Sequence, residues 1–305
     1  MMELLFLGTG ASVPSRDRAT SCIAVRVGPD IVLMDCGEGS QRQLMVSPFS
    51  FMKIRTILIT HMHGDHVFGL PGLLQTMSLS GRRDPLTVYG PVGLAHGVSA
   101  MMSVTEGETQ YPLEVVELEG GETFDVCGLR ITAYATSHGT PSVGFTVREP
   151  DRPGRLDRAR ALELGVHDGP EMALLKAGET VNGVSPSEVV GPPTPGASVS
   201  YTGDTVPCPG IVEASAGVDV LIHESTYMSS ESEMAADHFH STASQAAVAA
   251  REAGVRCLML THVSNRYDDR SLVEAEAREH FPEVVAVEDM DLFEITSRGV
   301  RRASR

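Results

Sequence analysis

The chain has 305 residues, of which 42% are hydrophobic and 21% are charged, and its formal net charge is −16. This composition is typical of a globular enzyme, and the acidity argues against a general nucleic-acid-binding surface, which usually leaves a basic footprint. No apolar stretch approaches the ~18–20 residues that a membrane span needs, and residues 1–7 lack the basic region of a signal peptide. We therefore expect a soluble, cytoplasmic protein.

Short apolar runs rich in β-branched residues recur along the chain and predict strands. They cover residues 4–7, 23–27, 31–34, 54–59, 86–89, 129–134, 143–147, 199–201, 218–222, 257–260 and 284–287. A helix is predicted over residues 244–253, because Thr242 and Gln245 form a capping box before it and Gly254 follows it. Another helix is expected over residues 272–280. The mixture predicts an α/β architecture in which helices pack on sheets.

Residues 149–197 interrupt this pattern, because they are rich in proline, glycine and charge. Nearly fifty residues without a strand are rare in a compact domain, so we expect an inserted arm that projects from one catalytic domain spanning residues 1–305. A flexible linker is the alternative, although residues 156–164 have helical spacing and need a surface to pack on. Residues 152–160 hold four arginines and one aspartate, which could bind phosphates or simply form a solvated helix face.

Seven residues of metal-ligand type follow predicted strands, at the position where open α/β sheets place their ligands. They are His61, His63, Asp65, His66, His138, Asp204 and His262. Five imidazoles and two carboxylates exceed the three or four protein ligands of a single zinc site, so we expect two metal ions. Imidazole-rich sites suit zinc, with iron, manganese or cobalt as alternatives. Two such ions can activate a shared water, which indicates hydrolysis.

The run from His61 to His66 resembles the H-x-H-x-D-H signature of the metallo-β-lactamase superfamily. The likeness extends over essentially the whole chain to the ribonuclease Z (tRNase Z) family in its short form, endonucleases that remove 3′ trailers from precursor tRNA. The motifs that carry it are the blocks at residues 8–14, 35–43, 60–74, 223–226, 240–242 and 261–267. This resemblance implies a metallo-β-lactamase αββα four-layer sandwich, two Zn²⁺ ions per subunit, a homodimer, and precursor tRNA as the partner.

The resemblance also implies roles for individual residues. One zinc ion would be held by His61, His63 and His138. The other would be held by Asp65, His66 and His262, with Asp204 bridging the two. Asp65 would also orient or deprotonate the attacking water. His240, steered by Glu224, would protonate the leaving ribose oxygen, as suits a histidine whose second nitrogen faces a carboxylate. A purely structural role for His240, near the start of a helix, is the alternative.

Arginines are the expected substrate-binding residues. The segment around residues 152–193 resembles the flexible exosite arm of the family, and the candidates are Arg18, Arg152, Arg155, Arg158 and Arg266. One departure concerns the family loop P-x-K-x-R-N, which reads Pro14-Ser15-Arg16-Asp17-Arg18-Ala19 here. The final amide is replaced by the methyl group of Ala19, so the amide that could help to position RNA at the cut is missing.

Two other functions remain open from the sequence. A hydrolase of the same fold could act on a small phosphodiester or an ester, with the same metal ligands but without need of an arm. A non-catalytic RNA-binding subunit is the second alternative, against which the intact ligand set and the pair Glu224 and His240 argue. Redox members of the superfamily typically carry Glu where this chain has His63, so they are disfavoured.

Overall fold

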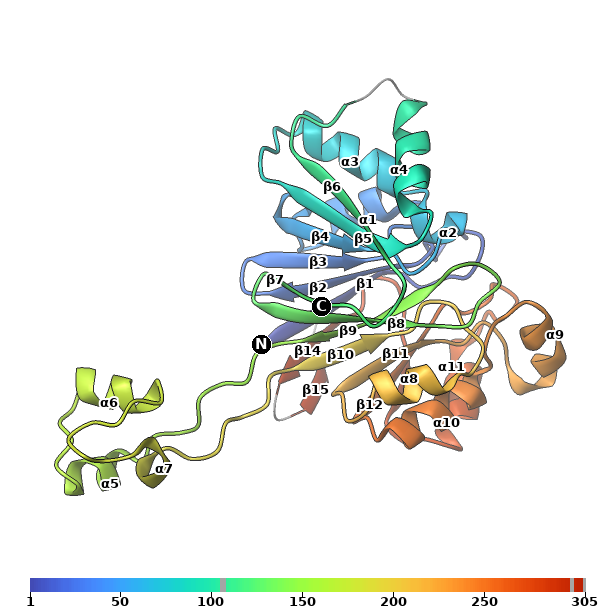
Figure 1. Cartoon of the computed structure of the whole chain (residues 1–305). Helices are drawn as coiled ribbons and strands as arrows, with labels where there is room; N and C mark the ends of the chain where they lie inside the picture. Colours follow the sequence, from blue (N-terminus) through green and yellow to red (C-terminus); the bar gives the residue numbers. More distant parts are fainter. Residues whose placement is uncertain (105–107, 297–298, 304–305) are drawn as a thin grey trace. The chain divides into compact units, whose positions relative to one another are not determined.

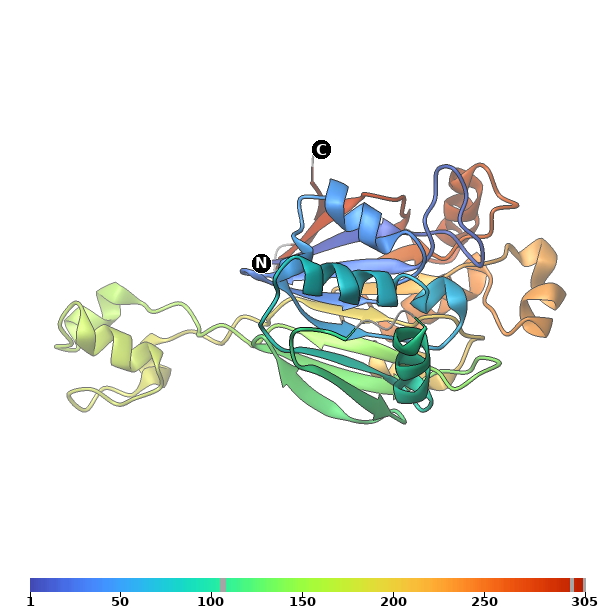
Figure 2. The same cartoon turned by 90° about the horizontal axis from the view of Figure 1, so that it is seen from above.

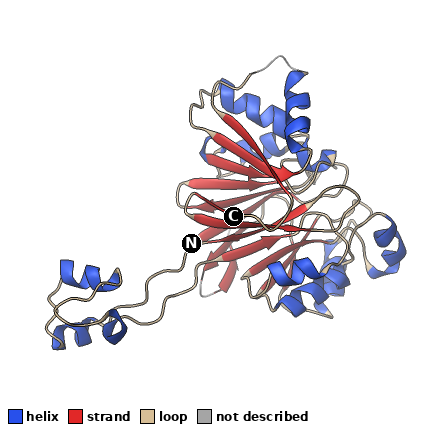
Figure 3. Cartoon of the chain, in the orientation of Figure 1, coloured by secondary structure: helices blue, strands red, loops and turns tan. Residues whose placement is uncertain are grey.

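Two β-sheets lie face to face in this protein, with helices on their outer sides (Figure 1). The computed structural model describes residues 1–104, 108–296 and 299–303. Figure 2 looks down on the helices that cover one sheet, and Figure 3 separates the helical and strand layers by colour. The layering confirms the predicted αββα sandwich.

The first sheet has eight strands among the described residues. In spatial order they are β15 (Gly299–Arg302), β14 (Leu292–Thr296), β1 (Met2–Gly8), β2 (Cys22–Val27), β3 (Asp30–Met34), β4 (Ile54–Leu58), β5 (Leu86–Pro91) and β6 (Leu113–Leu118). Strands β3 to β6 pair in parallel, so their carboxyl ends lie at one edge of the sheet.

The second sheet has seven strands in the described part of the chain. Their spatial order is β13 (Val284–Ala286), β12 (Cys257–Thr261), β11 (Val220–Glu224), β10 (Ser198–Tyr201), β9 (Val143–Arg148), β8 (Leu129–Ala135) and β7 (Thr123–Val126). Strands β10 to β13 are parallel. Strand β8 is antiparallel to β9, which is antiparallel to β10, so β8 and β10 run in the same direction and end at the same edge.

Strand β1 contributes side chains to two hydrophobic cores, one on each face of its sheet. Met2, Leu4 and Phe6 pack between the sheets, while Leu5 and Leu7 pack against the outer helices. Successive side chains of a strand point to opposite faces, so a strand buried on both faces is almost wholly apolar; the exception in β1 is Glu3, which pairs with Arg26. Each fully buried side chain of this size contributes roughly 1.5–3 kcal/mol.

Helices cover the outer face of each sheet. On the eight-stranded sheet these are α1 (Ser40–Val46), α3 (Leu70–Leu79) and α4 (Leu94–Ser103). On the seven-stranded sheet they are α8 (Pro209–Ala214), α10 (Ala243–Ala253) and α11 (Arg270–Arg278). Short helices occupy the connections: η1 (Phe51–Lys53), α2 (Gly64–Val67), η2 (Ser229–Glu231) and α9 (Ser232–Asp237). None of the helices in the described part of the chain is long and apolar enough to cross a membrane.

Helix α10 begins and ends as its sequence predicts. The side chain of Thr242 accepts a hydrogen bond from the backbone N–H of Gln245, whose own side chain accepts one from the backbone N–H of Thr242. The helix ends at Gly254, whose φ of 63° lies in the left-handed region that glycine adopts without strain. The capping box and the glycine stop are therefore confirmed.

Residues 149–196 form a separate compact unit. It contains α5 (Arg158–Glu163), α6 (Pro170–Lys176) and α7 (Pro186–Val189), packed around a small core of its own. The runs of chain that lead into and out of the unit pair with each other, through Arg152 with Thr194 and Leu156 with Val190. They cross so closely that a Cβ atom on Gly154 would lie 1.8 Å from the carbonyl oxygen of Gly191.

Every strand that the sequence predicted is present, with ends shifted by a residue or two. Four strands were not predicted: β6, β7, β14 and β15. Strands β6, β7 and β15 are edge strands, and β14 is next to an edge, between β15 and β1. Charged residues interrupt each of them, as Glu114 and Glu117 do in β6, so no continuous apolar run marks them.

Candidate metal centre

The seven predicted ligands come together where strands of both sheets end. His61, His63, Asp65 and His66 follow β4 of the eight-stranded sheet. His138, Asp204 and His262 follow β8, β10 and β12 of the other sheet. The two sheets are joined at this point, because the backbone N–H of Val143 donates to the carbonyl of Thr60 and His61 pairs with Ser142.

The first group of ligands contains three histidines. Ligand atoms of His61, His63 and His138 all lie within 4.8 Å of one another. Nδ1 of His63 and Nε2 of His138 are 3.2 Å apart. Three imidazole nitrogens converging on one point match the donor set of a zinc site.

The second group adds two carboxylates. Asp65, His66, Asp204 and His262 place their ligand atoms within 4.8 Å of one another. Oδ2 of Asp204 lies 3.3 Å from Nε2 of both His66 and His262, and 3.6 Å from Nε2 of His61. Asp204 therefore touches a member of each group, which is the position of a bridging ligand.

The buried atoms of this cluster fit a cation. Nε2 of His61, Nε2 of His66 and Oδ1 of Asp204 are buried and have no hydrogen-bond partner among the described residues. An unsatisfied buried polar atom typically costs about 1–3 kcal/mol, so three of them in one place require an explanation. Cations held by the two ligand groups would satisfy all three atoms.

Asp204 and His61 have the protonation states that metal binding needs, whereas His66 would have to lose a proton. Burial alone would raise the pKa of Asp204, but His262 and His66 lower it well below its ordinary value, so the carboxylate stays charged. Burial lowers the pKa of His61, which favours the neutral imidazole that binds metal. Burial also acts to lower the pKa of His66, but Asp204 and Asp35 raise it, so a cation would displace a proton there.

Asp35 orients the second group through its contact with His66, although the sequence motifs assign no role to this residue. Its Oδ2 atom lies 2.7 Å from Nδ1 of His66 and accepts a hydrogen bond from the hydroxyl of Tyr201 at 2.8 Å. Its Oδ1 atom accepts from the backbone N–H of Thr60 at 2.8 Å. The hydroxyl of Thr60 in turn lies 3.0 Å from Nδ1 of His61. Such partners hold each imidazole in the tautomer that directs Nε2 toward the metal.

Two further contacts orient His138 and His262. Nδ1 of His138 donates to the carbonyl of Phe239 at 2.8 Å. Nδ1 of His262 lies 2.8 Å from the hydroxyl of Thr226, which itself donates to Oε2 of Glu224. Because that hydroxyl uses its proton on Glu224, it accepts from His262 and leaves Nε2 of His262 free for metal.

Glu224 and His240 form the predicted pair. Oε1 of Glu224 lies 2.9 Å from Nδ1 of His240. The carboxylate also accepts from the backbone N–H groups of Thr205 and Thr226, so its oxygens are occupied and are poor candidates for a metal. Burial acts to lower the pKa of His240, but the charge and hydrogen bond of Glu224 outweigh it and raise the pKa to about 9. This shift favours the protonated form of His240 at neutral pH.

A glycine next to the bridging ligand sets the spacing of two loops. Gly203 has a φ of 60°, and a Cβ atom at this position would lie 2.6 Å from Cβ of Thr60. Only glycine permits this close approach, which brings the loop of Asp204 against the loop that carries His61.

The loop arginines have partners of different kinds. Arg18 donates to the carbonyl of Tyr267 at 2.7 Å, so part of its guanidinium joins two loops of the protein. Arg266 is exposed, lies over the ring of Tyr227 at 4.9 Å, and donates to the hydroxyl of Ser264. Arg16, beside Arg18, is exposed and lines the same cavity as Asn265, of about 680 Å³.

The arginines of the inserted unit are mostly paired with acids. Arg152 pairs with Glu149, Arg158 with Asp168, and Arg160 with Glu163. Arg155 has no ion pair among the described residues. Residues 149–196 contain eight acidic and five basic residues, a formal charge of −3, so the local excess of positive charge at 152–160 is offset by the rest of the unit.

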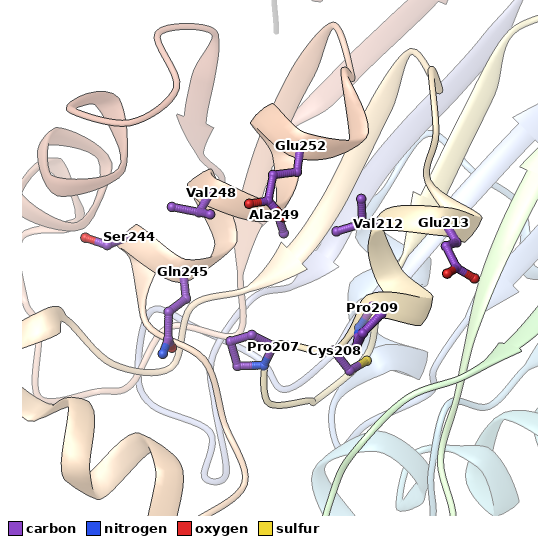
Figure 4. Close-up of a pocket in the computed structure, with 10 residues that line it drawn as sticks. All are labelled: Pro207, Cys208, Pro209, Val212, Glu213, Ser244, Gln245, Val248, Ala249 and Glu252. Atoms are coloured by element: carbon purple, nitrogen blue, oxygen red, sulfur yellow. The ribbon is translucent and has the colours of Figure 1, made fainter.

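A separate apolar cavity of about 540 Å³ lies between α8 and α10 (Figure 4). Its lining includes Pro207, Cys208, Val212, Val248 and Ala249. None of the seven metal-ligand residues lines it, so it is distinct from the candidate metal centre.

Comparison with known proteins identifies the family. A family model described as Beta-lactamase superfamily domain matches residues 173–263, and one described as Anti-Pycsar protein Apyc1 matches residues 2–152. The chain is 42% identical to ribonuclease Z of Methanosarcina mazei over 98% of its length and 99% of that protein. It is 41% identical to ribonuclease Z of Bacillus licheniformis, over 96% and 99% of the two chains. The crystal structure of the short form of human tRNase Z superposes with a TM-score of 0.70 at 30% identity, covering 96% of this chain and 99% of the human chain. The chain belongs to the ribonuclease Z family of metallo-β-lactamase-fold proteins.

Proposed function

We propose that this protein is a metal-dependent endoribonuclease that removes the 3′ trailer from precursor tRNA. The observation that carries the proposal is its relation, at 41–42% identity over nearly the whole of both chains, to proteins named ribonuclease Z. The pair of Glu224 and His240 beside the ligand cluster agrees with this chemistry, because the leaving alkoxide of a phosphodiester needs a general acid.

The metal is proposed to be zinc, with two ions per chain. His61, His63 and His138 would hold one ion, and Asp65, His66 and His262 the other, with Asp204 between them. The imidazole-rich donor set supports zinc as the metal. The two separate groups of ligand atoms support two ions per chain. When bound, such a pair supplies Lewis acidity that lowers the pKa of a water molecule and stabilises charge on the phosphate.

Side chains of this protein would handle both protons of the reaction. Oδ2 of Asp65 accepts a hydrogen bond from the backbone N–H of Ser12 at 2.8 Å, which fixes the carboxylate where it can orient the attacking water and accept its proton. Nδ1 of His240 faces Glu224, so Nε2 is the atom that donates a proton to the leaving ribose oxygen. The raised pKa of His240 keeps that proton in place at neutral pH.

The inserted unit is proposed to be an exosite for tRNA. Its own core supports a folded module that could bind RNA away from the cut. Of its arginines, Arg155 is the strongest candidate for phosphate contact, because Arg152 and Arg158 are engaged by acids. Around the centre itself, exposed Arg266 and the partly engaged Arg18 are the proposed phosphate contacts.

We also propose that the protein is a homodimer that acts in the cytoplasm. Met45 and Val46 of α1 and Leu79 of α3 are more than half exposed, and these two helices contact each other. Exposed apolar side chains on neighbouring helices are typical of a surface that a second subunit covers.

Cleavage of an end-labelled precursor tRNA by the purified protein tests the function. A cut at the discriminator base that is lost with chelator and in His63→Ala, and kept in the matched surface variant His280→Ala, is the expected result. Folded, metal-loaded protein that leaves the precursor intact but hydrolyses a small chromogenic phosphodiester would instead support the small-molecule hydrolase. RNA binding without any hydrolysis would support a binding subunit.

A further inference from the structure

Two phenylalanines beside the candidate metal centre keep much of their rings in solvent. Phe68 is 66% exposed and Phe239 is 48% exposed, and they are the two aromatic members among the large hydrophobic side chains exposed in the described part of the chain. Phe68 directly follows α2, and Phe239 lies two residues beyond α9. Figures 1 and 2 both place these helices at the same end of the sheets.

Each ring is seated against a glycine that neighbours a metal ligand. A Cβ atom on Gly64, which lies between His63 and Asp65, would be 2.3 Å from a ring carbon of Phe68. A Cβ atom on Gly139, which follows His138, would be 3.2 Å from the ring of Phe239. The absence of side chains at these two glycines lets each ring lie directly on a loop that carries ligands.

The backbone holds Phe239 in an unusual conformation. Its φ of 59° is in the left-handed region, which is rare for an aromatic residue and persists only where the surroundings impose it. The carbonyl of Phe239 accepts the hydrogen bond from Nδ1 of His138, and the next residue is His240. The ring is therefore fixed between a metal ligand and the proposed general acid.

The ring of Phe68 lines a cavity of about 390 Å³. Its lining also includes Asp65, Ser12, Pro14 and Glu38. This volume accommodates a nucleobase, with one aromatic wall, and the exposed carboxylate of Glu38 can accept a hydrogen bond from an exocyclic amino group.

We propose that Phe239 stacks on the base of the nucleotide 5′ of the scissile phosphate, and that Phe68 stacks on the base 3′ of it. This inference rests on the proposed function. His240 would protonate the ribose oxygen that stays with the 5′ nucleotide, and Phe239 is its neighbour in the chain. Phe68 lies beside Asp65, so we assign it to the other base, that of the first nucleotide of the trailer. Stacking accepts any base, because every base has a π face, and this suits an enzyme that cuts many different tRNAs.

A cycle that combines protein variants with abasic substrates tests the proposal. Phe239→Ala and Phe68→Ala are each assayed on precursor tRNA that is intact, abasic at the discriminator, or abasic at the first trailer nucleotide. We expect Phe239→Ala to lower kcat/KM about 5- to 150-fold on intact substrate, and to have little effect when the discriminator is abasic. Phe68→Ala should behave in the same way toward the abasic trailer nucleotide.

Controls separate stacking from damage to the site. Metal content is measured for each variant, Phe→Tyr replacements should keep activity, Phe→Leu replacements should lose it, and the exposed apolar variant Val104→Ala should match wild type. An equal loss on intact and abasic substrates would mean that the rings only shape their loops, and would overturn the stacking while leaving the endoribonuclease in place. Wild-type protein that does not cut the precursor would overturn the proposed function itself.

Discussion

Replacing Asp35 by asparagine should weaken the second metal site more than the first. Oδ1 must remain an oxygen, because the backbone N–H of Thr60 donates to it. The amide nitrogen of the new side chain would therefore replace Oδ2 and face Nδ1 of His66 and the hydroxyl of Tyr201. His66 could then keep a hydrogen bond only by moving its proton to Nε2, which is the atom directed at Asp204 and the metal.

The size of the effect follows from this change of tautomer. Loss of a carboxylate behind a ligating histidine typically costs 10- to 100-fold in metal affinity, or about 1.4–2.8 kcal/mol. The first site should be affected less, because the contact between the hydroxyl of Thr60 and His61 survives the substitution. Of the two ions proposed to bind, we therefore expect the affinity for one to fall by this factor and the affinity for the other to change little.

Competition of the apoprotein with a chromophoric zinc chelator measures both affinities. Asp30→Asn is the matched control, since Asp30 begins β3, the strand that Asp35 follows, but pairs with Arg55 in a partly exposed position. Two binding steps unchanged in Asp35→Asn, with native circular dichroism, would refute the reasoning. Equal weakening of both steps would show that Asp35 acts through general stability and not through His66.

Other perturbations test the proton donor and the local fold. Glu224→Gln removes the charge that raises the pKa of His240, so His240 should lose its proton at a lower pH and the alkaline limb of kcat/KM should move to lower pH. Gly203→Ala places a methyl group against Thr60 at a positive φ and should lower the free energy of unfolding by about 1–3 kcal/mol in a denaturant titration. Thr242→Ala removes the cap of α10 and should cost about 1 kcal/mol in the same assay.

Each of these predictions has a clear opposite outcome. An alkaline limb that stays in place in the Glu224→Gln variant would show that His240 is not the group that titrates there. Gly28 also has a positive φ but open space around it, so Gly28→Ala should cost less than Gly203→Ala; equal costs would rule out the steric contact. Removal of the cap should leave kcat unchanged, because the side chain of Thr242 is engaged in the capping box with Gln245; a large loss of activity would contradict a purely local role.

The predicted ligands lie close together because they were selected by their position directly after predicted strands. A polar residue directly after a buried parallel strand lies at the edge where other strands of the same direction also end. Asp35, which follows β3, fits the same rule, although the predicted ligand set does not include it. Thr226 gave no such signal, since a hydroxyl is not a ligand type and its role depends on contacts with Glu224 and His262.

Pairing between distant residues could not be predicted in the same way. The positive charge counted over residues 152–160 took no account of Asp168, which the fold of the inserted unit brings to Arg158. Phe239 gave no signal either, because the left-handed conformation of a single residue leaves no trace in the hydrophobic pattern. The division of the strands between two sheets came from the family resemblance, since strand periodicity alone does not assign partners.

The ligands are divided between the two halves of the sandwich, four after β4 and three after strands of the other sheet. A bound ion therefore acts as a cross-link between halves that are otherwise held together mainly by apolar packing. Its binding free energy adds to the stability of the fold in proportion to the logarithm of the free metal concentration. We therefore expect metal scarcity to expose the protein to unfolding and proteolysis, in addition to the loss of catalysis.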